Sequence, residues 1–388
     1  MSAVAATARW DIFCRVIDNF GDAGVSWRLA RLLAAEHGLD VTLWLDRLDA
    51  LAPIEPAIDA GRDAQRARGV TVRCWNDATA PTVPADVVVD AFGIGLPNGY
   101  VDAMVGRTPA TQWFILEYLT AEAWADGTHG LASPHPRLPL VRRFWIPGFT
   151  PRTGGLLREH DLFARRDAWQ GSANARDAFW RSLRLPIPAP DECRVSLFCY
   201  ADAPVSALLD AWTESAAPVV AIVPERVATA AIERWGGGGI AARPGARIAR
   251  GNATLHVVPF IAQDDFDRLL ACCDVNFVRG EDSLARAQWM ARPFVWQAYV
   301  QDDDAHQRKV DALCARYVDA LDDATASAVR NLWSAWNGAA GAIPVDRAWG
   351  PFFAGRAGVE RHARAWAERL DGLPELATGL VNAAKSSV

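Results

Sequence analysis

Lysine is almost absent from this chain of 388 residues: of its 40 basic residues, only Lys309 and Lys385 are lysines. The formal net charge is −6. General nucleic-acid binding depends on clustered basic side chains that neutralise phosphates, so we expect no nucleic-acid partner. An acidic surface would instead attract a basic partner.

Long apolar runs are also missing. No apolar run reaches 18 residues, and the N-terminal segment MSAVAATAR lacks the apolar core of a signal peptide. We therefore expect no membrane span and a cytoplasmic protein. The seven cysteines are odd in number and form no C-x-x-C pair, which predicts reduced, buried thiols. The histidines show no paired ligand spacing, so no metal is expected.

The composition is that of a globular enzyme, with 51% hydrophobic and 22% charged residues, and the length suits two domains. Short apolar strands alternate with amphipathic helices, which predicts an α/β protein with two Rossmann-like domains facing across a cleft. We expect the first domain at 9–170, a Pro-rich linker at 171–194 and the second domain at 195–356. A helix near 357–380 should return to the first domain. Most of the 17 tryptophans should fill cores.

Residues Val275–Val295 form the most informative stretch. A short apolar strand, Val275–Val278, is broken by Gly280, and helical periodicity begins at Glu281. A helix N-terminus that follows a strand and a glycine binds anions, because its first N–H groups are free and its dipole is positive there. Arg279 and Ser283 flank this turn and would suit a diphosphate. Glu281 and Asp282 are either ordinary N-terminal helix residues or acceptors for sugar hydroxyls.

The segment after the first strand, Ile17–Gly24, is rich in Asn, Asp and Gly and is predicted to be a turn before a helix at Val25–His37. Its Asp18 and Asp22 allow three interpretations. They could satisfy loop N–H groups, or belong to an incomplete dinucleotide fingerprint with Asp46 as the ribose-binding acid. As a third possibility, they could hold a guanidinium and supply a general base.

Two further loops carry candidate ligand-binding residues. Phe198 and Tyr200 share one face of an extended segment, where they either pack in the core or sandwich a nucleobase. Phe260 follows another strand, and Gln263 begins the next helix as either a solvent-facing residue or a partner for a pyrimidine edge. Residues 18–24, 198–200, 260–263 and 279–283 all follow predicted strands, so we expect these four loops to meet at one cleft. A polar helix is also expected within residues 53–70.

Three segments carry a family resemblance: FCRVIDNFGDAGVSWRLARLLAAEHG, VSLFCYADAPVSALLDAW and PFIAQDDFDRLLACCDVNFVRGEDSLARAQWMARPFVWQAYVQDDDAHQRK. They closely resemble the bacterial protein-arginine rhamnosyltransferases that act on elongation factor P, the EarP family, over about residues 10–364. The resemblance implies the GT-B glycosyltransferase fold, dTDP-β-L-rhamnose as donor and an arginine of elongation factor P as acceptor. It also implies inversion at the anomeric carbon without a cofactor, and rescue of ribosomes stalled at polyproline.

The resemblance further implies roles for individual residues. Asp22 would be the general base, Asp18 a supporting carboxylate and Glu281 a further catalytic residue. The residues implied in donor binding are Phe198, Tyr200, Phe260, Gln263, Arg279, Glu281, Asp282 and Ser283. The residues implied in the acceptor-side loop are Asn19, Phe20, Gly21 and Gly24. By residue chemistry alone, a transferase for another nucleotide sugar with a small or lipid acceptor, or a non-catalytic nucleotide-binding protein, remain alternatives.

Overall fold

The computed structural model describes residues 8–76, 79 and 81–386. It divides into two compact units: unit 1 comprises Met1–Glu159 and Gly372–Val388, and unit 2 comprises His160–Asp371. Each unit is an α/β domain built on one largely parallel sheet, as expected. In the described ranges, no helix is both long enough and apolar enough to span a bilayer.

Unit 1 contains an eight-stranded sheet in the order β3-β4-β2-β1-β5-β6-β8-β7. The strands are β1 (Arg9–Cys14), β2 (Asp40–Leu45), β3 (Ala64–Ala67), β4 (Val70–Cys74), β5 (Val87–Ala91), β6 (Gln112–Leu116), β7 (Ala132–Pro134) and β8 (Val141–Trp145). Neighbouring strands are parallel except for the antiparallel pairs β3–β4 and β7–β8 at the two edges. Because β1 lies between β2 and β5, the winding reverses there, and ligands of such sheets bind at that switch point.

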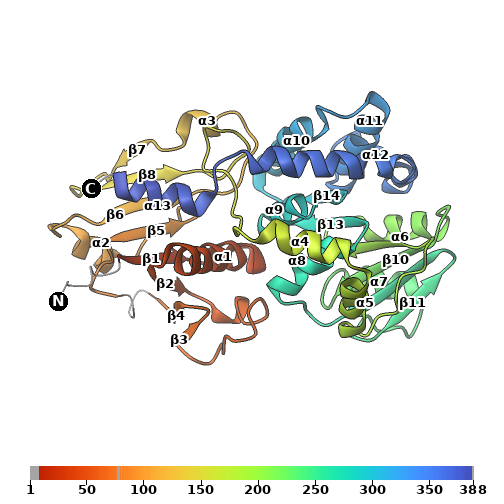
Figure 1. The fold of residues 1–388 in the computed structure, drawn as a ribbon, viewed down its shortest axis with the longest axis horizontal. Coiled ribbons are helices and arrows are strands. Elements are labelled where there is room, and N and C mark those ends of the chain that lie inside the picture. The colour runs from red at the N-terminus through yellow and green to blue at the C-terminus, as the bar shows by residue number, and fades with distance from the viewer. Residues whose placement is uncertain (1–7, 77–78, 80, 387–388) are drawn as a thin grey trace. The chain divides into compact units, whose positions relative to one another are not determined.

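The α-helices described in unit 1 are α1 (Asn19–His37), α2 (Asn98–Met104), α3 (Ala125–Thr128) and α13 (Leu376–Ser386). The C-terminal helix α13 packs against α1, at the other end of the chain (Figure 1). The side-chain amide of Gln112 on β6 also donates a 2.7 Å hydrogen bond to the carbonyl of Ala384. These contacts make the last helix part of the first unit.

Two local predictions in unit 1 are wrong. The segment Ile17–Gly24 is mostly helical, because α1 already begins at Asn19. Residues 53–70 contain no α-helix and instead form turns followed by β3. Arg68 and Gly69 have φ values of 47° and 82°, which a type I′ hairpin turn requires, so β3 folds back antiparallel onto β4.

Unit 2 contains a six-stranded sheet in the order β11-β12-β10-β9-β13-β14. Its strands are β9 (Cys193–Leu197), β10 (Val219–Pro224), β11 (Arg247–Arg250), β12 (Ala253–Val258), β13 (Val275–Arg279) and β14 (Phe294–Gln297). Only the edge pair β11–β12 is antiparallel. The switch point lies between β9 and β13, so the loops after these two strands are the expected place for a ligand.

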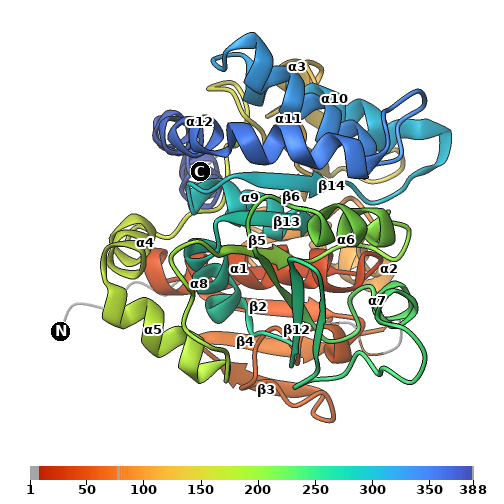
Figure 2. The same ribbon diagram turned by 90° about the vertical axis from the view of Figure 1, so that its right-hand side faces the viewer.

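The α-helices described in unit 2 are α4 (Leu162–Gly171), α5 (Ala173–Ser182), α6 (Val205–Thr213), α7 (Thr229–Gly236), α8 (Gln263–Cys272), α9 (Asp282–Trp289), α10 (Ala305–Val318), α11 (Asp323–Trp336) and α12 (Val345–Asp371). Helix α11 lies along β14, and α12 packs on α11 and α6 (Figure 2). The helix expected near 357–380 is therefore two helices, since the chain bends at residues 372–375 and only α13 belongs to unit 1.

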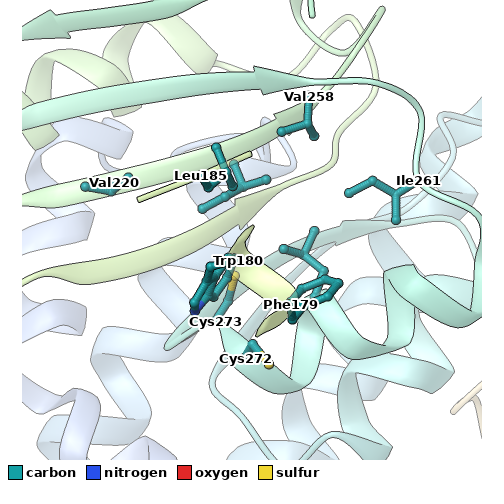
Figure 3. Packing of buried hydrophobic residues seen from close by; sticks show 10 residues of the cluster. Phe179, Trp180, Leu185, Val220, Val258, Ile261, Cys272 and Cys273 are labelled. Carbon is teal, nitrogen blue, oxygen red and sulfur yellow. The ribbon is translucent and has the colours of Figure 1, made fainter. Parts of the chain in front are cut away.

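Helices α4 and α5 belong to unit 2, although the sequence placed residues 162–182 at the end of the first domain and in the linker. Phe179 and Trp180 of α5 are buried beside Leu185, Ile261 and Cys273 (Figure 3). Such apolar burial, about 25 cal/mol per Å², attaches the segment to the second sheet. The Pro-rich stretch therefore belongs to unit 2, where Leu185 is buried and most of residues 186–190 are exposed.

The tryptophans and cysteines behave as expected. All tryptophans are buried except Trp124 and Trp169, and in unit 1 Trp44 stacks on Phe13 with ring centroids 5.7 Å apart. All seven cysteines are free thiols, and only Cys74 is not fully buried. The prediction that most tryptophans fill cores is therefore confirmed.

Candidate active site

In unit 2, Arg279 lies against two aromatic rings at the switch point. Its guanidinium carbon is 4.3 Å from the ring centroid of Phe198 and 4.6 Å from that of Tyr200. One guanidinium nitrogen donates a 2.8 Å hydrogen bond to the carbonyl of Cys199, between the two aromatic residues. Arg279 ends β13 and the aromatic residues follow β9, so two adjacent strands bring the three side chains together. The group can offer a positive charge and flat rings to one ligand.

The turn from β13 into α9 is held by its own hydrogen bonds. Gly280 has a φ of 61°, a left-handed conformation that glycine adopts without steric cost. Ser283 accepts a 3.1 Å hydrogen bond from the Arg279 N–H, and its hydroxyl donates to the Arg279 carbonyl. Trp296 donates a 2.8 Å hydrogen bond to the Gly280 carbonyl. The N-terminus of α9 is thus held at a defined place beside Arg279.

Gln263 and Asp282, both predicted to bind the donor, are bonded to each other. The Gln263 amide donates a 2.8 Å hydrogen bond to Asp282, and Gln263 is only 7% exposed. One turn further along both helices, Asp267 and Arg286 form a buried ion pair with a 2.7 Å contact. Helices α8 and α9 are therefore joined by two polar contacts that fix the start of α9. Glu281 immediately precedes α9 and is half-buried.

The structure adds two aromatic residues that the sequence analysis did not single out. Phe266 packs edge-on against Phe198 with centroids 5.3 Å apart, and Tyr299 packs edge-on against Tyr200 at 5.5 Å. Tyr299 is 47% exposed, so part of its ring faces solvent. Phe266 lies three residues after Gln263, on the same face of α8, which is the signal that could have found it. Phe260 is half-buried in the loop after β12.

In unit 1, Asp22 stands in the first turn of α1 and is 2% exposed. Its Oδ2 accepts backbone N–H bonds from Ile17 and Asp18, both at 2.8 Å. Burial raises the pKa of Asp22, while these two N–H bonds lower it less than burial raises it. The expected alternative, a carboxylate that satisfies loop N–H groups, is therefore realised. A carboxylate with a raised pKa that is held in a fixed orientation is also compatible with the predicted role of general base.

Asp18 precedes α1 and is half-buried. Its carbonyl accepts the N–H groups of Gly21, at 2.7 Å, and Asp22, at 3.2 Å. A Cβ at position 21 would lie 2.5 Å from Asp18 Oδ2, so a larger residue there would have to displace the Asp18 carboxylate. Phe20 is half-buried and Gly24 buried in the same helical turn, which begins with Asn19. The acidic pair and its loop are thus brought together within unit 1.

Asp90, on β5, and Tyr118, after the neighbouring strand β6, were not predicted as site residues. Burial raises the pKa of Asp90 on β5 to about 7. Tyr118, two residues after β6, stacks on Phe92 with ring centroids 4.5 Å apart and makes a side-chain hydrogen bond to Asp22. Tyr118 follows an apolar strand in the sequence, which is the same signal that identified the four predicted loops, whereas Asp90 lies within its strand.

Comparison with known proteins defines the class. A glycosyltransferase from Rickettsia africae shares the fold with a TM-score of 0.52 at 7% identity, covering 98% of both chains. A structure solved for EarP-mediated arginine glycosylation of translation elongation factor EF-P matches with a TM-score of 0.70 at 34% identity. It covers 98% of this chain and 100% of that chain. The fold and the switch-point sites define a GT-B glycosyltransferase.

Sequence comparison gives the family. Residues 10–385 match the model of the family described as elongation-factor P (EF-P) rhamnosyltransferase EarP. A protein-arginine rhamnosyltransferase of Pseudomonas putida is 46% identical over 381 residues, 98% of this chain and 100% of that protein. Its counterpart from Pseudomonas aeruginosa is 40% identical, over 96% of this chain and 98% of that protein. The chain belongs to this rhamnosyltransferase family, which confirms the resemblance seen in the sequence.

Proposed function

We propose that this enzyme transfers L-rhamnose from dTDP-β-L-rhamnose to an arginine side chain of translation elongation factor P, with inversion at the anomeric carbon. The observation that carries this proposal is the Arg279 guanidinium lying against Phe198 and Tyr200 beside the start of α9. The relatives named for arginine rhamnosylation and for glycosylation of EF-P support the choice of sugar and acceptor.

The donor is expected to bind unit 2. The aromatic rings of Phe198, Tyr200 and Phe260 offer flat surfaces for the thymine base, and Gln263 its hydrogen-bonding edge. The diphosphate would lie at Arg279 and the N-terminus of α9, where a guanidinium and the helix dipole both favour negative charge. The same groups stabilise the charge that develops on the departing dTDP, so the protein needs no metal for this step. Glu281 and Asp282 are placed to accept hydrogen bonds from sugar hydroxyls.

The acceptor arginine is expected to meet the acidic loop of unit 1. A guanidinium has a pKa above ~12, so its nitrogen lone pairs are delocalised and poorly nucleophilic. Asp22 and Asp18 would hold the group by forked hydrogen bonds, and Asp22 would take the proton as the nitrogen attacks the anomeric carbon. Glu281 is a further candidate for orienting the guanidinium. A single displacement without an enzyme nucleophile inverts the anomeric centre. The product would serve the factor's role at ribosomes stalled on polyproline in the cytoplasm.

The decisive experiment incubates the enzyme with dTDP-β-L-rhamnose and elongation factor P and measures the mass of the acceptor. We expect a gain of one deoxyhexose on an arginine. The Asp22→Asn variant should lose at least about a hundredfold in rate, the usual contribution of a general base, and should still bind dTDP. Full activity of Asp22→Asn would show that another group is the base.

Calorimetry with dTDP, UDP and NAD distinguishes the remaining candidates. A preference for dTDP supports the proposal. A preference for UDP favours another nucleotide sugar, and a preference for NAD would revive the dinucleotide interpretation of Asp46. That residue already accepts a 2.9 Å hydrogen bond from the Val16 N–H, which gives it a structural role in the same loop.

A further inference from the structure

Tyr118, which bonds to the proposed base Asp22, forms an aromatic pair with Phe92. Their rings are stacked with an interplanar angle of 18°, and the Phe92 N–H donates a 2.6 Å hydrogen bond to the Leu116 carbonyl. Phe92 follows β5 and Tyr118 follows β6, which are adjacent parallel strands of unit 1. The sheet itself therefore sets the distance between the two rings.

Phe92 adopts an uncommon backbone conformation to make this contact. Its φ is 66°, in the left-handed region, which is sterically unfavourable for an L-residue with a Cβ. Such strain persists where surrounding packing over-determines it, and it concentrates at functional sites. Phe92 is 8% exposed, so its ring is a fixed support for the half-buried ring of Tyr118.

The Tyr118 hydroxyl gives Asp22 a third hydrogen bond. The two others come from the backbone N–H groups of Ile17 and Asp18, both on Oδ2. Three donors from two separate segments restrain both the position and the rotation of the carboxylate. We propose that Tyr118, supported by Phe92, is a positioning residue that orients the Asp22 carboxylate toward the acceptor guanidinium. This inference rests on the proposed function of Asp22 as the base.

The charged surroundings of Asp22 define what the hydroxyl does to its protonation. Burial raises the pKa of Asp22, and the nearby Asp18 raises it further, while the Tyr118 hydroxyl lowers it.

Cys14 of β1 also faces Asp22, and burial raises the pKa of that thiol, so it stays neutral. The carboxylates of Asp46 after β2 and Asp90 on β5 act on the same thiol, and Glu117 acts on Asp90. The neighbouring carboxylates disfavour ionisation of Asp22, and the hydrogen bond from Tyr118 opposes this effect by stabilising the ionised base.

The test compares Tyr118→Phe with Tyr317→Phe over pH 5.5–9, using elongation factor P and dTDP-β-L-rhamnose as substrates. Tyr317 is a matched control, since its buried hydroxyl has no hydrogen-bond partner among the residues described. Loss of a hydrogen bond to a charged group disfavours the ionised form by about tenfold or more. We therefore expect Tyr118→Phe to move the acidic limb of the kcat profile upward by about one pH unit. Its plateau kcat should fall about tenfold, with KM for the donor unchanged and Tyr317→Phe like wild type.

Other outcomes would overturn the inference. A wild-type pH profile for Tyr118→Phe would do so, and so would a change confined to KM for elongation factor P, which would make Tyr118 an acceptor contact. Phe92→Leu, which removes the stacked ring but keeps the hydroxyl, is a second variant that should move the limb in the same direction by a smaller amount. If Tyr118→Phe melts early, this variant decides the question. Full activity of Asp22→Asn would instead contradict the proposed function, so the two failures are distinguishable.

Discussion

The side-chain amide of Gln263 at the start of α8 donates a 2.8 Å hydrogen bond to the carboxylate of Asp282 at the start of α9. Both residues were expected to contact the donor, and the structure shows that they also contact each other. The orientation of either side chain toward a nucleotide sugar therefore depends on the other. A test of donor binding has to treat the two residues as a pair.

We predict that Gln263→Glu weakens dTDP binding by about 10- to 100-fold, because it replaces a charge-assisted hydrogen bond with two facing carboxylates. The double variant Gln263→Glu/Asp282→Asn restores one donor and one acceptor in reversed order and should recover part of this loss. Isothermal titration calorimetry with dTDP measures both variants against the wild type. If the double variant binds no better than Gln263→Glu, Gln263 acts by direct contact with the base.

The buried pair Asp267–Arg286 should contribute strongly to stability. Both side chains are almost fully buried, and the guanidinium forms 3.0 Å and 2.7 Å hydrogen bonds with the carboxylate. Arg286→Met removes the charge that neutralises Asp267 and should lower the free energy of unfolding by about 3–5 kcal/mol. The double variant Asp267→Leu/Arg286→Met should recover most of this loss. Urea unfolding, followed by a signal from unit 2, measures the free energy of unfolding of both variants.

An exposed pair provides the control. Arg62 and Asp59 form a 3.2 Å contact with side chains 72% and 58% exposed, so Arg62→Met should change stability by less than about 1 kcal/mol. A similar small effect for Arg286→Met would show that the buried pair is not needed for stability. In that case, the two contacts between α8 and α9 would not explain the placement of α9.

Asp90 should make stability fall as pH rises. Burial raises its pKa to about 7 from an ordinary value of 3.8, so between these values the folded state binds more protons than the unfolded state. Stability is therefore highest below about pH 4 as far as this group is concerned, and it is lost as pH rises through about 7. The difference between the two pKa values corresponds to roughly 4 kcal/mol in the free energy of unfolding. Asp90→Asn stays neutral and should gain stability over wild type progressively between pH 5 and pH 8.

Urea unfolding at pH 5, 6, 7 and 8 measures this difference. The exposed Asp191 is a matched control, since Asp191→Asn should follow wild type at every pH. If the free energy of unfolding changed with pH in the same way for Asp90→Asn and wild type, the prediction would be contradicted. The Gly95 N–H bond to Asp90, 3.2 Å long, can be kept by the asparagine carbonyl, so the substitution tests charge more than packing.

The α/β class and the candidate site within each unit were predictable because they depend on local patterns. Runs such as Val87–Ala91 and Gln112–Leu116 are buried strands in the structure, as their apolar residues indicate. Loop residues that follow parallel strands meet at one edge of the sheet, which is why Phe198, Tyr200 and Arg279 come together. The roles assigned to these residues stay predictions.

The sequence by itself determined two α/β units, the loops after strands that carry the candidate residues, and the family. These features depend on hydrophobic periodicity and on short motifs, which are local properties of the chain. Only the tertiary structure decided which helices belong to which sheet and which polar groups bond. Helices α5 and α13 are attached by apolar contacts with residues far away in the sequence, and no local pattern encodes that choice. Gln263 likewise bonds to Asp282 of another helix, and Asp22 bonds to the distant Tyr118 as well as to its own loop, because burial makes a polar side chain bond with whichever group the fold places beside it.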